Sequence, residues 1–166
     1  MLQHWMRGQM TSEDVVAQVC KELRFEPEIM LKELVLSCQN MRLMSENTLN
    51  LVTSIRSRGI KVVIATDNMD TFQWWTVPSL GLNHYFDDIL SSSELGALKG
   101  DTDEQGRSLF FIPYLKANAI GLGESLLLDD SDERLGQIIR RTGIDYEHVE
   151  PGALDAMLER ILSLQK

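Results

Sequence analysis

Apolar residues in the first part of the chain recur at helical spacing. Thr11 and the acids that follow it form a start signal for one helix, and Pro27 fits the first turn of a second. A third helix is expected to end at Gly59. Residues 1–44 are therefore predicted to form a helical segment of their own, ahead of a larger domain over residues 45–166.

Beyond Gly59 the pattern changes to short apolar runs with turn residues behind them. Buried strands are expected at 60–65, 88–90, 126–128 and 146–149. Helices are expected between and after them, at 109–120, 132–142 and about 152–164. Strands separated by helices predict an α/β domain with a mostly parallel sheet.

Two prolines lie within the predicted helical stretches. Pro113 is expected either to lie in the first turn of its helix or to kink that helix, since proline disrupts a helix interior. The stretch that holds Trp74 and Trp75 is expected to break near Pro78, with both rings contributing to the packing of the core or the cap.

Composition narrows the class of protein. The chain has 166 residues and a formal net charge of −9, which argues against a nucleic-acid or membrane-surface partner. No apolar run is long enough to span a bilayer, and no signal peptide is visible. Cys20 and Cys38 fall in helix-like segments, so a reduced, cytoplasmic protein is expected.

The most distinctive feature is an apolar strand that ends on Asp129 and Asp130. Ligands bind outside the carboxyl ends of parallel strands, and paired carboxylates there attract a cation. The alternative is a helix N-cap at Asp130 or Ser131, opening the helix that follows. The residues alone leave both interpretations open.

Two further polar residues occupy comparable places. Thr66 ends the strand over 60–65, and Lys99 lies in the loop region between the two strands. With a carboxylate they form a plausible oxyanion site, composed of a hydroxyl donor, a cation and a metal ligand. Taken singly, Thr66 could be a helix cap and Lys99 a solvated lysine.

In this order the motifs resemble the haloacid dehalogenase (HAD) superfamily of phosphatases and related hydrolases. The run from Val62 to Asn68 resembles the second motif of that family, and the run from Leu126 to Ser131 resembles the fourth. Lys99-Gly100-Asp101 keeps the Lys and Asp of the third motif but not its Pro. The helices before residue 44 resemble the family's inserted cap, so the resemblance covers almost the whole chain.

The resemblance implies a three-layer Rossmann-like core with a parallel sheet and an N-terminal helical cap. It implies that Thr66, Asn68 and Lys99 bind the phosphoryl group of a small phosphorylated substrate or another anion. It implies Mg²⁺ at Asp130 and Asp129, with metal binding weak or absent in this chain because Arg134 stands where the family commonly has Asn or Asp. A homo-oligomer is an open possibility.

The first motif of the family, a central strand ending in Asp-x-Asp, has no match in this sequence. Asp101-Thr102-Asp103 has the letters but follows no apolar strand, so no nucleophile can be named. Loss of that strand would leave buried backbone groups unpaired, each costing about 1–3 kcal/mol. A longer parent protein is the favoured explanation. The alternatives are direct pairing of the strands that end at Thr66 and Asp129, or a strand donated by another chain.

The predicted function is therefore a Mg²⁺-dependent HAD-like phosphatase in truncated or inactive form. The alternative is a non-catalytic HAD-like protein that binds a partner or an anion.

Overall fold

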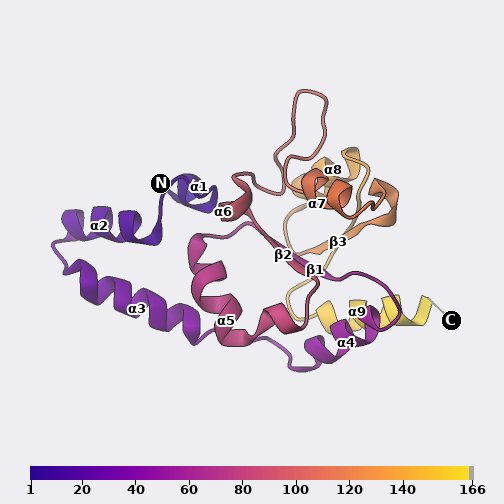
Figure 1. The fold of residues 1–166 in the computed structure, drawn as a ribbon, viewed down its shortest axis with the longest axis horizontal. Coiled ribbons are helices and arrows are strands. Elements are labelled where there is room, and N and C mark those ends of the chain that lie inside the picture. Colours follow the sequence, from indigo (N-terminus) through magenta and orange to yellow (C-terminus); the bar gives the residue numbers. More distant parts are fainter. Residues whose placement is uncertain (165–166) are drawn as a thin grey trace. The chain divides into compact units, whose positions relative to one another are not determined.

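The structure is a computed structural model that describes residues 1–164. The helices are α1 (Leu2–Met6), α2 (Ser12–Leu23), α3 (Pro27–Gln39), α4 (Asn47–Arg56), α5 (Val77–Leu80), α6 (Ser92–Leu95), α7 (Ile112–Ala117), α8 (Glu133–Arg141) and α9 (Leu154–Leu164). The strands are β1 (Val63–Thr66), β2 (Asp88–Ser91), β3 (Leu126–Asp129) and β4 (Asp145–His148). A π-helical turn, η1 (Phe72–Thr76), and two 3₁₀ turns, η2 (Leu82–His84) and η3 (Leu122–Glu124), complete the mixed α/β fold (Figure 1).

The contacts divide the chain into two compact units, and neither is a continuous segment. The first unit comprises Met1–Leu43 and Val63–Ala97, and the second comprises Met44–Val62 and Leu98–Lys166. The helical residues before position 44 thus share a unit with β1 and β2. Whether they act as a cap stays a prediction.

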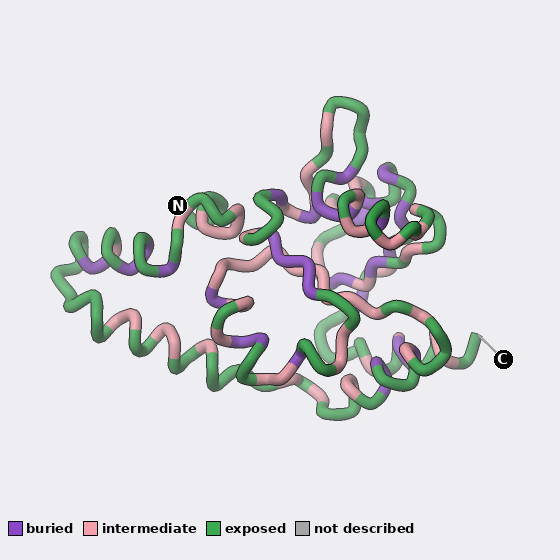
Figure 2. Tube along the Cα trace, viewed as in Figure 1, coloured by how far each residue is buried: buried purple, intermediate pink, exposed green. Residues whose placement is uncertain are grey.

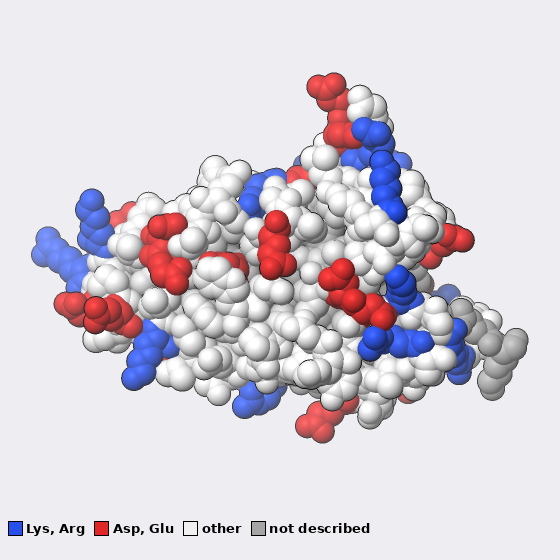
Figure 3. Space-filling view, viewed as in Figure 1, with Lys and Arg blue, Asp and Glu red and all other residues white. Residues whose placement is uncertain are grey.

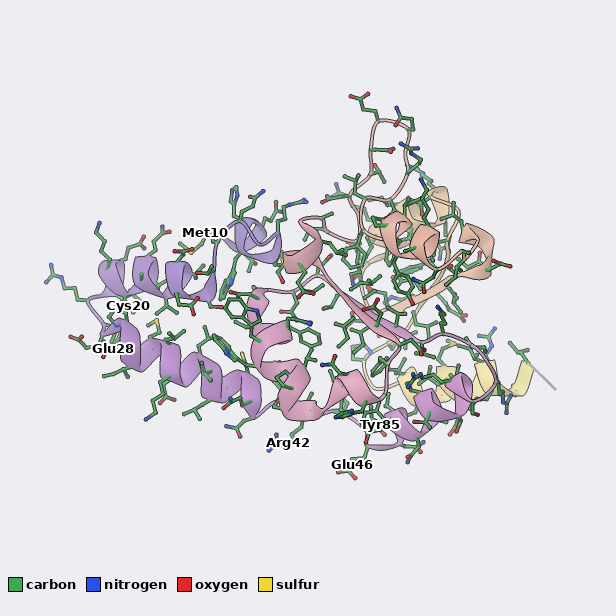
Figure 4. The ribbon with its side chains drawn as sticks, viewed as in Figure 1. Met10, Cys20, Glu28, Arg42, Glu46 and Tyr85 are labelled. Atoms are coloured by element: carbon green, nitrogen blue, oxygen red, sulfur yellow. The ribbon has the colours of Figure 1, made fainter. Side chains whose placement is uncertain are left out.

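In the first unit α2 and α3 lie side by side as a helical hairpin (Figure 1). Thr11 begins α2 with a capping box, in which its hydroxyl accepts from Asp14 N and the Asp14 carboxylate accepts from Thr11 N. The buried residues of α2 lie on the side toward α3 (Figure 2). Cys20 projects between the two helices, with its Sγ 3.5 Å from Met30 Sδ (Figure 4).

In the second unit α4 packs against α9, and α8 packs against β4. The Asp155 carboxylate of α9 accepts hydrogen bonds from Ser45 Oγ at 2.6 Å and Thr48 Oγ1 at 2.5 Å. These bonds fix the start of α4 on the first turn of α9. A buried apolar cluster that includes Val52, Ile55 and Leu158 supports the same pair of helices.

The strands form two separate two-stranded parallel sheets, β1–β2 and β3–β4. Val63 is paired with Asp88 in the first, and Leu126 with Asp145 in the second. Within residues 1–164 each of β1 and β3 therefore has one strand partner.

Several element boundaries differ from the predictions. The strand expected at 60–65 begins later, at Val63, and the helix expected at 109–120 is shortened to Ile112–Ala117. Pro113 does lie in the first turn of α7. Pro78 lies in the first turn of α5 and so helps to begin a helix, not to break one.

The surface carries an exposed aromatic ring and charges of both signs. Trp74 was expected to pack in the core or the cap, but it is 50% exposed. Acidic and basic side chains are interspersed over the face shown in Figure 3. Among the described residues no helix is both long and apolar enough to cross a membrane. Cys20 and Cys38 are free thiols.

Candidate functional site

The carboxyl end of β3 holds a buried ion pair. Asp129 is the last residue of the strand and is 8% exposed, and the Lys99 ammonium forms a salt bridge with its Oδ2. Lys99 is equally buried at 8% exposure. Buried charges are costly unless they are paired, so this lysine is not one of the solvated lysines of the surface.

The environment keeps Asp129 ionised. Burial alone would raise its pKa, but hydrogen bonds from Lys99 and Ser131 and the positive charge of Lys99 outweigh burial and bring the pKa below its ordinary value. The Ser131 amide donates to Asp129 Oδ1 at 2.9 Å. Both carboxylate oxygens of Asp129 thus have protein donors.

The turn after β3 is held from the neighbouring strand. The Tyr146 hydroxyl donates to the Ser131 carbonyl at 2.9 Å, and His148 Nδ1 lies 2.9 Å from the same oxygen. Gly136 on α8 makes room for the ring, because a Cβ there would lie 2.7 Å from Tyr146 Cε1. Burial and the Asp129 charge raise the pKa of Tyr146, so the hydroxyl remains protonated and able to donate.

The helix that follows is capped by a residue other than those expected. Asp132 is the N-cap of α8, and its carboxylate accepts from Leu135 N at 3.1 Å. The alternative in which Asp130 or Ser131 caps this helix is therefore wrong. The Asp130 carboxylate remains on the surface beside the buried pair. Arg134 is exposed on α8.

The Asp-x-Asp sequence at 101–103 has a structural role. Asp101 Oδ2 accepts from Leu98 N at 2.8 Å. The Asp103 carboxylate accepts from the amides of Gln105 and Arg107 and from Arg107 Nε. These bonds stabilise the loop that carries Lys99, and they occupy the carboxylates that a nucleophile and a general acid would need.

Thr66 and Asn68 lie in the first unit, whereas Lys99, Asp129 and Asp130 lie in the second. Thr66 ends β1 and is paired in register with Ser91. Asn68 is bound through its backbone to Ser92, whose hydroxyl accepts from Asn68 N at 3.0 Å and donates to Asn68 O at 3.1 Å. Asn68 Oδ1 accepts from Met69 N at 2.9 Å.

The residues at the tip of β3 do not make a closed metal site. Asp129 is engaged by Lys99 and Ser131, which leaves Asp130 as the exposed carboxylate of the pair. Nowhere in residues 1–164 do three or more His, Cys, Asp or Glu side chains gather closely enough to hold an ion. Asp130 is therefore the carboxylate that this end of β3 offers to a Mg²⁺ ion, which proteins commonly hold through one or two carboxylates and water.

Sequence reasoning missed the residues that support the turn. Tyr146 and His148 lie on β4, and Asp129 is paired with His148 in register. The predicted parallel sheet could have suggested that β3 and β4 are neighbours. Nothing in the sequence indicates that both side chains converge on the Ser131 carbonyl.

Comparison with solved structures identifies the fold. A predicted HAD-like family hydrolase from Porphyromonas gingivalis matches with a TM-score of 0.72 and 15% identity, covering 96% of this chain and 77% of that one. A HAD-family enzyme from Bacteroides thetaiotaomicron, solved in complex with magnesium and inorganic phosphate, matches with a TM-score of 0.70 and 14% identity. That match covers 90% of this chain and 74% of the enzyme.

No family model matches the sequence, and no curated protein matches it by sequence. The structural matches show that the chain has the HAD-like hydrolase fold.

Proposed function

We propose that this chain binds the phosphoryl group of a small phosphorylated metabolite, with phosphomonoester hydrolysis as the class of reaction. The buried Lys99 at the carboxyl end of β3 carries the proposal. A lysine held there by Asp129 supplies a fixed positive charge at the edge where parallel sheets bind ligands. Two solved structures of similar fold hold magnesium and inorganic phosphate.

The roles of the residues follow from their chemistry and from the motif resemblance. Lys99 supplies charge to a phosphoryl oxygen, and Asp129 orients Lys99. Thr66 and Asn68 are assigned as donors to the phosphoryl group on the resemblance of their motif. Asp130 is the candidate Mg²⁺ ligand, and with one exposed carboxylate we expect weak binding. No residue among 1–164 is assigned as the nucleophile.

Calorimetric titration tests the proposal. Inorganic phosphate is titrated into the 166-residue chain with and without Mg²⁺, and Asp130→Asn is compared with Asp145→Asn, an exposed aspartate at the start of β4. We expect the Asp130 variant to lose the Mg²⁺-dependent part of binding, by about tenfold or more, and the control to keep it. Failure of the wild-type chain to bind phosphate would contradict the proposal.

A non-catalytic anion-binding protein is the second candidate. The observation that favours it is the engagement of Asp129 by Lys99 and Ser131, which leaves the metal side of the site incomplete. Turnover of p-nitrophenyl phosphate with Mg²⁺ separates the two functions. Turnover that Asp130→Ala abolishes would exclude the non-catalytic alternative, whereas phosphate binding without turnover would support it.

If another copy of the chain donates the missing strand, the protein is an oligomer in solution. Light scattering after size-exclusion chromatography measures the mass. A monomer that nevertheless turns over p-nitrophenyl phosphate would exclude it.

A further inference from the structure

The two faces of α3 differ in what covers them. Met30 and Cys38 lie half-buried on one face, where Met30 Sδ is 3.5 Å from Cys20 Sγ of α2. The Cys38 carbonyl accepts from Thr76 Oγ1 of η1 at 3.3 Å. None of the thirteen residues of α3 is fully buried. The helix therefore packs on the first unit through one face, and its opposite face is exposed (Figure 2).

The exposed face of α3 carries an apolar stripe. Ile29 is 63% exposed and Leu36 is 40% exposed. Seven positions, almost two helical turns, separate them, so both side chains lie on the same face of the helix. Phe25, in the connection between α2 and α3, and Leu23, at the end of α2, are each more than half exposed. We call the surface formed by these four residues the hairpin stripe.

The size of the hairpin stripe is typical of an interaction surface. Four large apolar side chains exposed to this extent leave on the order of 400 Å² of apolar surface in contact with water. Monomeric proteins seldom expose more than a few hundred Å² of contiguous apolar surface. Two hairpin stripes that face each other, with the polar residues around them, would bury an area at the lower end of the range for specific interfaces. Such an area fits a reversible contact.

The charges beside the hairpin stripe favour a second copy of the chain as its partner. Successive residues of a helix point about 100° apart, so Lys32 and Glu33 flank the line from Ile29 to Leu36 on opposite sides. Both residues are exposed. When two α3 helices pack in parallel about a twofold axis, Lys32 of each copy faces Glu33 of the other. The face is therefore complementary to itself, as a twofold contact requires.

A lipid surface fits the hairpin stripe less well. Helices that lie on membranes carry Lys and Arg beside their apolar face, because membrane surfaces are commonly anionic. Glu28 and Glu33 outnumber Lys32 on α3, and the whole chain has a formal net charge of −9. The charge of this region therefore opposes binding to an anionic membrane.

We propose that the hairpin stripe is a dimer interface, in which α3 packs in parallel against α3 of a second copy. Ile29 and Leu36 of both copies form its apolar centre, and the two pairs of Lys32 with Glu33 fix its register. The contact uses neither β1 nor β3, so it is independent of strand donation. It is equally independent of phosphoryl binding, and each proposal can fail while the other stands.

Sedimentation velocity of the 166-residue chain at increasing concentration tests the proposal. We expect a reversible monomer–dimer equilibrium with a Kd of the order of 10 µM. Ile29→Gln should raise the Kd about tenfold or more, because it places a polar group in the apolar centre. Leu109→Gln is the matched control at an exposed leucine of the second unit, and it should leave the Kd unchanged.

Reversal of the flanking charges tests the register. Lys32→Glu leaves two acids beside the stripe, and Glu33→Lys leaves two lysines, so either variant alone would set like charges against each other in a dimer. We expect each to be monomeric at concentrations where the wild-type chain is a dimer. An equal mixture of the two should form a heterodimer, because the acids of one variant then face the lysines of the other.

Each outcome supports or overturns the proposal. A chain that stays monomeric at every concentration would overturn it, also where that monomer co-sediments with phosphatidylcholine vesicles. A dimer that Ile29→Gln weakens no more than Leu109→Gln would overturn it too, and would indicate another interface. A mixture of the charge variants that remains monomeric would contradict the register. Selective loss of the dimer with Ile29→Gln and its recovery in the mixture would support the proposal.

Discussion

At the scale of single residues, the buried pair of Lys99 and Asp129 should contribute strongly to stability, because loss of either partner would leave a buried charge unpaired. The sequence indicated each residue separately, Lys99 as an anion ligand and Asp129 as a metal ligand. The structure shows that the two bind each other across 30 positions of sequence. Sequence pattern reports spacing along elements, and it contains no signal for a side-chain contact over such a separation.

Lys99→Met should destabilise the fold by about 3–5 kcal/mol, because the variant leaves the Asp129 carboxylate buried without its cation. Urea unfolding measures the loss. Lys116→Met, at an exposed lysine of α7, should change stability little. The double variant Lys99→Met with Asp129→Asn should lose clearly less than the sum of the single changes. Additive losses would contradict a direct interaction.

Asp129 should also make stability depend on pH in the acid range. Its pKa is lowered below the ordinary value of 3.8 in the folded state, so its contribution is fully present above about pH 4. That contribution is lost as the pH falls through the folded pKa. The difference in unfolding free energy between wild type and Asp129→Asn should therefore shrink on acidification. A difference that does not change with pH would show that the ion pair is not its source.

At the scale of elements, sequence patterns found the elements better than their ends. β-branched runs and acids in first helical turns are local signals, and they placed the strands ending at Thr66 and Asp129. The N-cap of α8 is Asp132 and not Asp130 or Ser131. All three residues are of types that can cap a helix, so the sequence does not distinguish between them. Trp74 lies within the π-helical turn η1 and is half exposed. A prediction based on the α-helical period assigns the wrong face to a residue in such a turn.

The contact between Gly8 and Ser93 yields a prediction at this scale. Gly8→Ala should destabilise the first unit by about 1–3 kcal/mol, since alanine is strained at positive φ and its Cβ would meet the Ser93 carbonyl. Gly96→Ala is the matched control, with φ +70° and no atom within 4 Å of the built Cβ. The control reports the strain alone. Equal melting temperatures for the two variants would argue against the close contact.

At the scale of the whole molecule, the fold class could be predicted because motif order survives where overall sequence similarity is low. The ordered motifs indicated a HAD-like fold, and structures only 14–15% identical have that fold. The division into two discontinuous units could not be predicted. It depends on which helices pack together, and residues 1–43 group with 63–97 through contacts distant in sequence.

The packing of α4 on α9 also sets an order of events during synthesis. Ser45 and Asp155 are 110 positions apart, so α4 leaves the ribosome long before its partner exists. The first unit can close once residue 97 has emerged, but the second must wait for nearly the last residue described. Closing so long a loop costs conformational entropy before the contacts between α4 and α9 can form. Folding of the second unit should therefore be the slow step. During that interval the apolar side of α4 is exposed, and we expect chaperones to bind it.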